Sequence, residues 1–336
     1  MPSLSDFLYT QLVLRIPKPS ASFTSKTVII TGANAGLGKE TAQHMIRLGA
    51  SKVIFGCRSP VRGEQAKREI ERLLKCRADI ITVWELDLES PASIRRFVDQ
   101  ANALPRLDVV INNAGVHVAS YTVVYDTERT LAVNDIGTFL LALQLLPKLK
   151  ETARKHGVTP HMTTVSSALY DIAKYPESRG DDMDIFAWFK DEAHVNLMNQ
   201  YNLSKLFQLY IIIKLSAIVD PIDADNPNPN PIVINSLDPC FCKTGLSGDL
   251  TGAPKVFFSI FRAIFARTAE EGARLVVQAA SAGRETHGLY LRAGAVQKYA
   301  PIAQDEKRVS YVWDQLCQRL EKLQPGVLTN IQAVKS

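Results

Sequence analysis

The sequence predicts an α/β fold with one doubly wound parallel sheet, helices on both faces of that sheet and a variable cap beside the substrate. Two observations support this class. Short runs rich in β-branched residues, of which 26–31 is the first, alternate with amphipathic segments of helix length. The first run also leads through a glycine-rich turn, 31–38, into a helix. Because strands separated by helix-length segments form parallel sheets with right-handed crossovers, the alternation indicates the fold class.

Each strand and helix is predicted from the spacing of its apolar residues and from the residues at its two ends. We expect strands, enriched in β-branched residues, at 26–31, 53–55, 80–84, 107–111, 161–165, 231–236 and 288–291. We expect helices, with apolar residues at helical spacing, at 36–48, 62–74, 91–103, 126–150, 199–219, 253–265, 268–280 and 305–323. The segment 220–231 contains repeated prolines, which remove backbone donors and restrict their neighbours, so we expect a surface loop there.

The domain organisation is expected to be simple, because no internal repeat and no linker divides the chain into two cores. Residues 26–325 would form a single Rossmann-type domain. Residues 1–25 would be an N-terminal extension, with a short amphipathic helix around 4–16 and a Pro/Ser linker. Insertions at about 168–198 and 244–267 would form the cap, and 326–336 would be a C-terminal tail.

Composition and charge exclude several classes of partner. The chain has 39 basic and 34 acidic residues, a formal charge of +5, and its basic residues are scattered rather than gathered in a run. We therefore expect no nucleic-acid partner. The histidines show no ligand-like spacing, and Cys240 and Cys242 have no second pair nearby, so we expect no metal site.

The cysteines and apolar windows favour a cytoplasmic protein. The five cysteines lack paired Cys-x-x-Cys spacing, which suits reduced thiols in a reducing compartment. The N-terminus lacks a basic region followed by a long apolar core, so we expect no secretory signal. The windows 207–219 and 256–265 are short and are interrupted by Lys214 and Arg262, so neither is expected to span a bilayer.

The glycine-rich turn is a candidate nucleotide site. Gly32, Gly36 and Gly38 lie between a predicted strand and a predicted helix, where glycines bring backbone N–H groups against a pyrophosphate. Their G-x-x-x-G-x-G spacing differs from G-x-G-x-x-G, and a purely structural turn explains them about equally well. Arg58 stands 58 − 38 = 20 residues later, where an NAD-binding fold carries an acidic ribose ligand. A guanidinium pairs with a 2′-phosphate, which favours NADP(H); the alternative is a surface arginine in a weak ion pair.

A second candidate site is the pair Tyr201 and Lys205, which share one helix face at i and i+4. A phenol titrates near pH ~10 in water, so a fixed cation is needed to stabilise its phenolate. The alternative is an ordinary amphipathic helix. Two further segments, Asn112–Gly115 and Val165–Ser167, close predicted parallel strands, where ligands bind in open α/β sheets. Turn chemistry explains the first of these equally well.

Together these residues resemble the short-chain dehydrogenases/reductases, over about residues 26–290. The resemblance is carried by Thr31-Gly-x-x-x-Gly-x-Gly38, Asp87, Asn112-Asn-Ala-Gly115, Asn134, Ser166-Ser167 and Tyr201-x-x-x-Lys205. It implies that Tyr201 is the general acid/base, that Lys205 lowers the pKa of Tyr201, and that Ser167 polarises the substrate oxygen. Asn134 would hold a relay water behind Lys205. The implied cofactor residues are Gly32, Asn34, Gly36, Leu37, Gly38, Arg58, Asp87, Leu88, Asn113, Ala114, Gly115, Tyr201, Lys205, Pro239 and Thr244.

Within that family, the segments around Asn134, Arg58 and Arg267 look most like the retinol-dehydrogenase-like branch. One departure is Cys240, which follows Pro239 where the family pattern has glycine and bears on the backbone near the carboxamide of the cofactor. The resemblance implies an NADP(H)-dependent oxidoreductase that interconverts a carbonyl and an alcohol. The alternatives are a catalytically silent NADP(H)-binding regulator and an epimerase or dehydratase.

The chain between Ser167 and Tyr201 has 201 − 167 − 1 = 33 residues and is longer than is usual in the family. Its aromatic residues and the 256–265 stretch either line a pocket for a small, mostly apolar carbonyl or alcohol substrate, or serve as packing. The aromatic residues are Tyr170, Tyr175, Phe186, Trp188 and Phe189. A third use of 256–265 is peripheral contact with a membrane surface.

Overall fold

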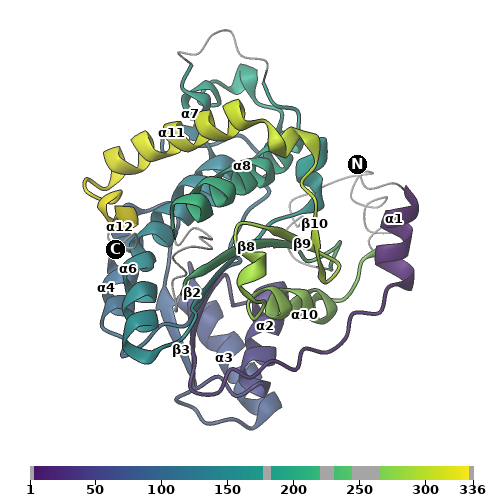
Figure 1. The fold of residues 1–336 in the computed structure, drawn as a ribbon, viewed down its shortest axis with the longest axis vertical. Coiled ribbons are helices and arrows are strands. Elements are labelled where there is room, and N and C mark those ends of the chain that lie inside the picture. The colour runs from purple at the N-terminus through teal and green to yellow at the C-terminus, as the bar shows by residue number, and fades with distance from the viewer. Residues whose placement is uncertain (1–3, 177–182, 220–230, 244–262, 264, 333–336) are drawn as a thin grey trace.

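The computed structural model describes residues 4–176, 183–219, 231–243, 263 and 265–332. An eight-stranded sheet forms its centre (Figure 1), in the order β10-β9-β8-β7-β4-β1-β2-β3. Every neighbouring pair in the sheet is parallel except β9 with β10. The strands are β1 (Thr27–Thr31), β2 (Lys52–Cys57), β3 (Ile81–Glu85), β4 (Val109–Asn112), β7 (His161–Val165), β8 (Val233–Asp238), β9 (Tyr290–Arg292) and β10 (Ala295–Gln297). The predicted fold class is confirmed, with one antiparallel edge strand added.

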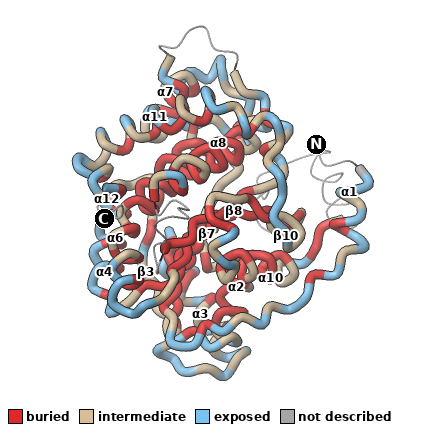
Figure 2. Tube along the Cα trace, viewed as in Figure 1, coloured by how far each residue is buried: buried red, intermediate tan, exposed pale blue. Residues whose placement is uncertain are grey.

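Two apolar clusters lie on opposite faces of this sheet. Along β1, Ile29 belongs to one cluster, whereas Val28 and Ile30 belong to the other, as the alternation of side chains along a strand requires. The first cluster is completed by α4 (Pro91–Asn102), α6 (Thr138–His156), α8 (Leu197–Ile218) and α11 (Glu306–Leu323). The second is completed by α2 (Gly36–Arg47), α3 (Pro60–Leu74) and α10 (Ala269–Ala279). The central strands and α8 are accordingly buried (Figure 2).

Side-chain caps define where most long helices begin. Ser59, Ser90, Asn196 and Asp305 each accept a backbone N–H of the helix that follows. Thr268 forms a full capping box at the start of α10. The exception at the edge of the candidate site is α2, whose N-cap residue Ala35 provides no side-chain hydrogen bond. The first backbone N–H groups of α2 are thus left without a side-chain cap.

The predicted helix 126–150 is wrong at its start. A hairpin of β5 (Val123–Val124) and β6 (Thr127–Glu128) turns at Tyr125 and Asp126, which have φ of 53° and 57°. The chain then passes through α5 (Arg129–Leu131) and a π-helix, η2 (Ala132–Gly137), before α6 runs to His156. Two consecutive left-handed residues suit a tight hairpin but not a helix, and Tyr-Asp lacks the glycine that normally signals this turn.

Several other elements differ from expectation. Strand β10 was not predicted and pairs with β9 through a turn at Ala293 and Gly294, both with positive φ. The predicted helix 253–265 lies almost wholly outside the described residues, as does the predicted loop 220–231. The remaining short elements are α1 (Leu4–Leu8), η1 (Tyr9–Val13), η3 (Ala168–Ile172), α7 (Ile185–Trp188), η4 (Glu192–His194), η5 (Arg284–Thr286), η6 (Pro301–Gln304) and α12 (Thr329–Gln332).

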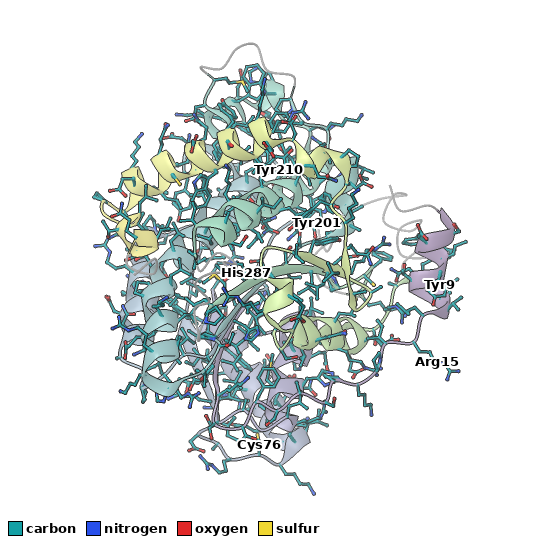
Figure 3. The ribbon with its side chains drawn as sticks, in the orientation of Figure 1. Tyr9, Arg15, Cys76, Tyr201, Tyr210 and His287 are labelled. Carbon is teal, nitrogen blue, oxygen red and sulfur yellow. The ribbon has the colours of Figure 1, made fainter. Side chains whose placement is uncertain are left out.

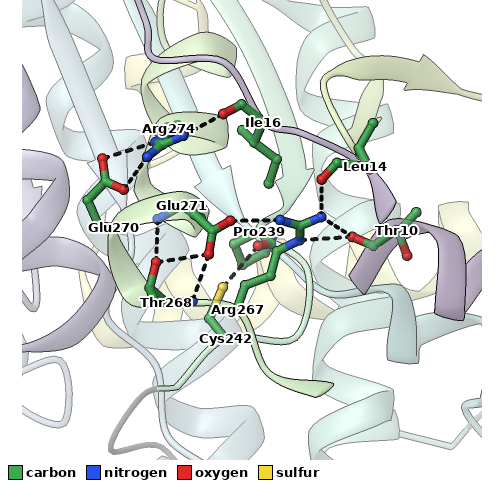
Figure 4. A network of polar contacts seen from close by, with 10 residues as sticks. All are labelled: Thr10, Leu14, Ile16, Pro239, Cys242, Arg267, Thr268, Glu270, Glu271 and Arg274. Carbon is green, nitrogen blue, oxygen red and sulfur yellow. Dashed lines mark hydrogen bonds and ion pairs between the residues drawn. The ribbon is translucent and has the colours of Figure 1, made fainter. Parts of the chain in front are cut away.

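The N-terminal segment packs on the main domain rather than projecting from it (Figure 1). Ile16 and Phe23 are buried in the second apolar cluster. The guanidinium of Arg267 binds the carbonyl oxygens of Thr10 and Leu14, and Arg274 binds that of Ile16 at 2.5 Å (Figure 4). Residues near the start of the chain are thereby attached to α10, which contains Arg274, and to the residues just before it, which include Arg267.

One helical stretch in the described chain, Arg129–His156, is long and apolar enough to cross a membrane. Because 94% of its most apolar window is buried inside the protein, this stretch is the core helix of the first cluster.

Candidate active site

The candidate residues from both ends of the domain meet at the carboxyl edge of the sheet. Thr31, Asn112 and Val165 end strands β1, β4 and β7, and Asp238 ends β8. The first turns of α8 bring Tyr201 to the same edge, where it lies near the centre of the molecule (Figure 3). This is the position at which open α/β sheets bind ligands.

The glycine-rich turn leaves room for a ligand against the backbone. Gly32 and Gly36 adopt φ of 69° and 51°, in the left-handed region that favours glycine. A Cβ atom on Gly38 would lie 2.6 Å from Nδ2 of Asn113 and 2.7 Å from the carbonyl oxygen of Gly32, so only glycine fits there. This cradle and the uncapped start of α2 fit the phosphates of a nicotinamide dinucleotide.

Hydrogen bonds join the turn after β1 to the turn after β4. Nδ2 of Asn113 donates to the carbonyl oxygen of Thr31 at 2.8 Å, and the N–H of Ala114 donates to Oγ1 of Thr31 at 2.9 Å. Gly115 lies beside Asn134, because a Cβ there would come within 3.2 Å of Oδ1. The structure therefore brings Asn113, Ala114 and Gly115 together with the glycine turn.

Arg58, the residue predicted to pair with a 2′-phosphate, lies directly after β2. Its guanidinium is 63% exposed and lies 3.5 Å from the carboxylate of Glu89, which also pairs with Arg129 at 2.7 Å. Asp87 accepts the N–H of Glu89 at 3.0 Å, and Leu88 is buried. Arg58 is thus exposed at a strand end, held by one long ion pair.

Tyr201 is enclosed by Ser167, His117 and Lys205. Its phenol is hydrogen-bonded to Ser167, and the imidazole of His117 stacks on its ring with centroids 5.0 Å apart. The ammonium of Lys205 lies 5.4 Å from the centre of the same ring. His117 was not among the sequence candidates; its only signal is its place two residues after the Asn112–Gly115 turn.

Lys205 is held by two oxygen acceptors behind the tyrosine. Nζ donates to the carbonyl oxygen of Val165 at 2.9 Å and to Oε1 of Gln208 at 3.1 Å. Burial lowers the pKa of this ammonium to about 8, and the carboxylates of Asp135 and Asp238 act in the opposite direction.

The pKa of Tyr201 departs from the expectation that Lys205 would lower it. Burial and the nearby Asp238 carboxylate raise the pKa of the phenol, and the hydrogen bond to Ser167 lowers it. Of these three effects on the pKa, the burial of the phenol is the largest. Tyr201 therefore keeps its proton at neutral pH, as a proton donor must.

Asn134 ties the π-helix η2 to the site. Its side chain accepts the N–H of Val116 at 2.8 Å, while Nδ2 donates to the carbonyl oxygen of Val116 and to Oγ of Ser204, both at 3.0 Å. Its backbone carbonyl accepts Nε2 of Gln208 at 2.9 Å. Asn134, which was expected to hold a relay water behind Lys205, therefore has a side-chain donor on its backbone carbonyl.

The turn after β8 shows how Cys240 replaces the family glycine. Cys240 has φ of 65°, so it adopts the left-handed conformation that glycine favours. Oδ1 of Asp238 accepts the N–H of Cys240 at 3.2 Å, and Oδ2 of Asp238 lies 3.3 Å from Arg292. Burial raises the pKa of the Cys240 thiol to about 12, which keeps it unreactive. Pro239 lies in this turn, and Thr244 lies outside the described residues.

The aromatic residues before α8 are mainly packing residues. Tyr170, Phe186 and Phe189 are buried in the first apolar cluster, and Tyr175 and Trp188 are half-buried against it. Phe186 and Tyr175 both contact Phe207 of α8 edge-on, with ring centroids 5.8 and 6.1 Å apart. In the parts of the chain that the structure describes, no group of three His, Cys, Asp or Glu side chains is placed to hold a metal ion.

Comparisons with known proteins identify the family of this chain. Residues 26–168 match the model of the short chain dehydrogenase family. A short chain dehydrogenase/reductase of Cryptosporiopsis sp., dmxR8, is 35% identical over 96% of this chain and 99% of its own length. The short chain dehydrogenase atnD of Emericella nidulans is 38% identical over 88% of this chain and 93% of its own.

Solved structures share the architecture. An uncharacterized protein of Mycobacterium paratuberculosis superposes with a TM-score of 0.64 at 27% identity, covering 90% of this chain and 95% of that one. The chain belongs to the short-chain dehydrogenase/reductase family, a family of oxidoreductases.

Proposed function

We propose that the protein is an NADP(H)-dependent oxidoreductase that interconverts a carbonyl and an alcohol on a small, mostly apolar molecule. The observation that supports this most is the unit of Ser167, Tyr201 and Lys205 at the sheet edge that also carries the glycine turn. A scaffold that only bound the nucleotide would need no hydroxyl pair in front of a fixed ammonium. We assign these residues, with Asn134, to one catalytic domain over 26–325.

Each of these residues has a chemical task in this proposal. When bound, the nicotinamide supplies or accepts the hydride. Ser167 hydrogen-bonds the substrate oxygen, and Tyr201 gives that oxygen its proton in reduction or takes it in oxidation. Lys205 stabilises the phenolate that results, by its charge. The glycine turn and the start of α2 would hold the phosphates of the cofactor, with Pro239 beside its carboxamide.

The preference for NADP(H) is assigned to Arg58. Its exposed guanidinium at the end of β2 is available to a 2′-phosphate if its long ion pair with Glu89 gives way. A charge-assisted hydrogen bond of this kind contributes about 1.5–3 kcal/mol, or roughly tenfold to a hundredfold in affinity. Arg58→Ala should therefore weaken NADPH at least tenfold and leave NADH nearly unchanged. Arg77→Ala is the control, because it makes the same charge change at an ion pair in which Arg77 is 75% exposed. Equal losses of affinity for NADPH and NADH in Arg58→Ala would refute the contact.

The catalytic role is tested with Tyr201→Phe. Purified protein mixed with NADPH and a panel of ketones and aldehydes should lose nicotinamide absorbance, and the variant should be slower by about 10²–10⁴. Tyr210→Phe is a matched control on the same helix, because its hydroxyl donates to the carbonyl oxygen of Ile302 at 2.7 Å rather than to a residue of the site. Unchanged turnover in Tyr201→Phe would refute the assignment, and NADPH binding without turnover of any compound would favour a silent regulator.

We also infer a cytoplasmic location. The five cysteines are free thiols, and burial raises the pKa of Cys57 to about 11, so the protein suits a reducing compartment.

A further inference from the structure

The side chain of Gln208 connects two residues of the site that sequence reasoning left separate. Oε1 accepts the ammonium of Lys205 at 3.1 Å, and Nε2 donates to the backbone carbonyl of Asn134 at 2.9 Å. The side chain is 1% exposed, so water does not compete for either contact. Gln208 lies one turn after Lys205 on α8, which places both groups on the face that packs against η2.

The chemistry of the two partners determines how this amide is oriented. An ammonium has donors only and a carbonyl has acceptors only, so the amide must turn its oxygen to Lys205 and its nitrogen to Asn134. A carboxylate in this position would accept from Lys205 but leave the Asn134 carbonyl facing another acceptor. An apolar side chain of similar length would leave both buried groups without this partner.

We propose that Gln208 is a positioning residue of the active site: its carboxamide spans the gap between Lys205 and the Asn134 carbonyl, where a relay water was expected. This role rests on the proposed function. Gln208 and the carbonyl oxygen of Val165 accept two of the three N–H groups of the Lys205 ammonium. The third N–H group is left for the cofactor or Tyr201. Because an amide does not readily pass a proton along, Lys205 acts here through its charge rather than as a link to Asn134.

The charged and titratable groups around Lys205 determine how its pKa should change when Gln208 is replaced. Asp135 of η2 and Asp238 at the end of β8 both favour the ammonium, and Tyr201 lies in front of it. Asp135 is itself buried near Glu128, and burial raises the pKa of its carboxyl well above the usual range. The oxygen of Gln208 accepts a hydrogen bond from Lys205 at 3.1 Å, and this bond stabilises the ammonium more than the neutral amine because a charged donor makes the stronger bond.

The test measures the titration of Lys205 in the full chain, without substrate, by NMR of protein labelled with [ε-13C]lysine. Lys205→Arg identifies the signal. Gln208→Leu should lower the titration midpoint, because it removes an acceptor from the ammonium. Gln208→Glu should raise it by about one pH unit or more, a tenfold change in proton affinity, because it adds a carboxylate. Gln144→Leu, which removes an amide that donates to Leu140 of its own helix at 3.0 Å, should leave the midpoint unchanged.

A merely structural role would lower stability without moving the midpoint in opposite directions. An unchanged midpoint in Gln208→Leu would overturn the proposal, as would a shift of both variants in the same direction. If wild-type protein reduces no carbonyl, the proposed function fails, and this titration still decides the role of Gln208. Where turnover is found, the alkaline limb of the kcat/KM profile should move with the NMR midpoint in each variant.

Discussion

Arg267 offers the sharpest prediction about how the N-terminal segment is held. Its side chain is 5% exposed and donates twice to the carbonyl oxygen of Thr10, at 2.6 and 2.8 Å, as well as to that of Leu14. It also pairs with Glu271 at 2.9 Å (Figure 4). Its backbone forms a bridge with Cys242, close to the turn that contains Cys240. The same residue therefore holds the N-terminal segment and the chain after β8.

The perturbation is Arg267→Lys, which keeps the charge but loses the planar fork that reaches several carbonyls at once. Removing such hydrogen bonds from a buried site costs about 1–3 kcal/mol for each group left unsatisfied, and these costs do not add fully. We expect a loss of about 3 kcal/mol in the free energy of unfolding. With an unfolding entropy of about 2.1 cal/mol/K per residue, that loss lowers Tm by roughly 4 °C.

The assay is urea unfolding followed by circular dichroism, with limited trypsin digestion as a local readout at the exposed Arg15 (Figure 3). Arg274→Lys is the matched control, since Arg274 is 19% exposed and bonds Glu270 and Ile16. The Arg274→Lys variant should lose about 1 kcal/mol or less in the free energy of unfolding. Equal losses in the two variants, or unchanged cleavage at Arg15 in Arg267→Lys, would refute the reasoning.

Three further predictions concern the site itself. Cys240→Gly should be more stable than Cys240→Ala by about 1 kcal/mol in urea unfolding, because both lose the thiol but only glycine relieves the left-handed φ of 65°; a less stable glycine variant would contradict this. Because Lys205 has a pKa of about 8, raising the pH through that value removes its charge, and kcat/KM should fall on the alkaline side; a flat profile to pH ~10 would oppose the electrostatic role. Ser167→Ala should reduce kcat/KM for the ketone panel without changing NADPH affinity, and weaker NADPH binding in titrations would assign Ser167 to the cofactor instead.

Local patterns predicted the parts of the site that depend on one turn or one helix. The turn at Gly32–Gly38 needs glycine for its φ values and for the close approach of Asn113, so its chemistry is visible in the residue types. The i, i+4 spacing of Tyr201 and Lys205 likewise follows from a single helix. The strands were found because their residues are buried on both faces, as in β1 and β4.

Contacts between distant segments were not visible in the sequence. His117 reaches Tyr201 only because β4 ends and α8 begins at the same edge of the sheet. Gln208 reaches Asn134 only because η2 packs on α8, and a buried glutamine on an apolar helix has no local signature. The hairpin at Tyr125 and Asp126 was missed because tertiary packing, including the bond from Tyr125 to Leu88 at 2.8 Å, supports left-handed residues that local propensity disfavours.

The measurement that tests the central claim most directly follows a deuterium label. NADPH deuterated at the transferred position of nicotinamide C4 is incubated with the protein and a ketone that it turns over, and the product is examined by mass spectrometry and NMR. We predict one deuterium on the new carbinol carbon with wild-type protein and Tyr210→Phe, and a far lower rate with Tyr201→Phe. Product that forms without deuterium at that carbon would contradict hydride transfer and point to another reaction on this scaffold.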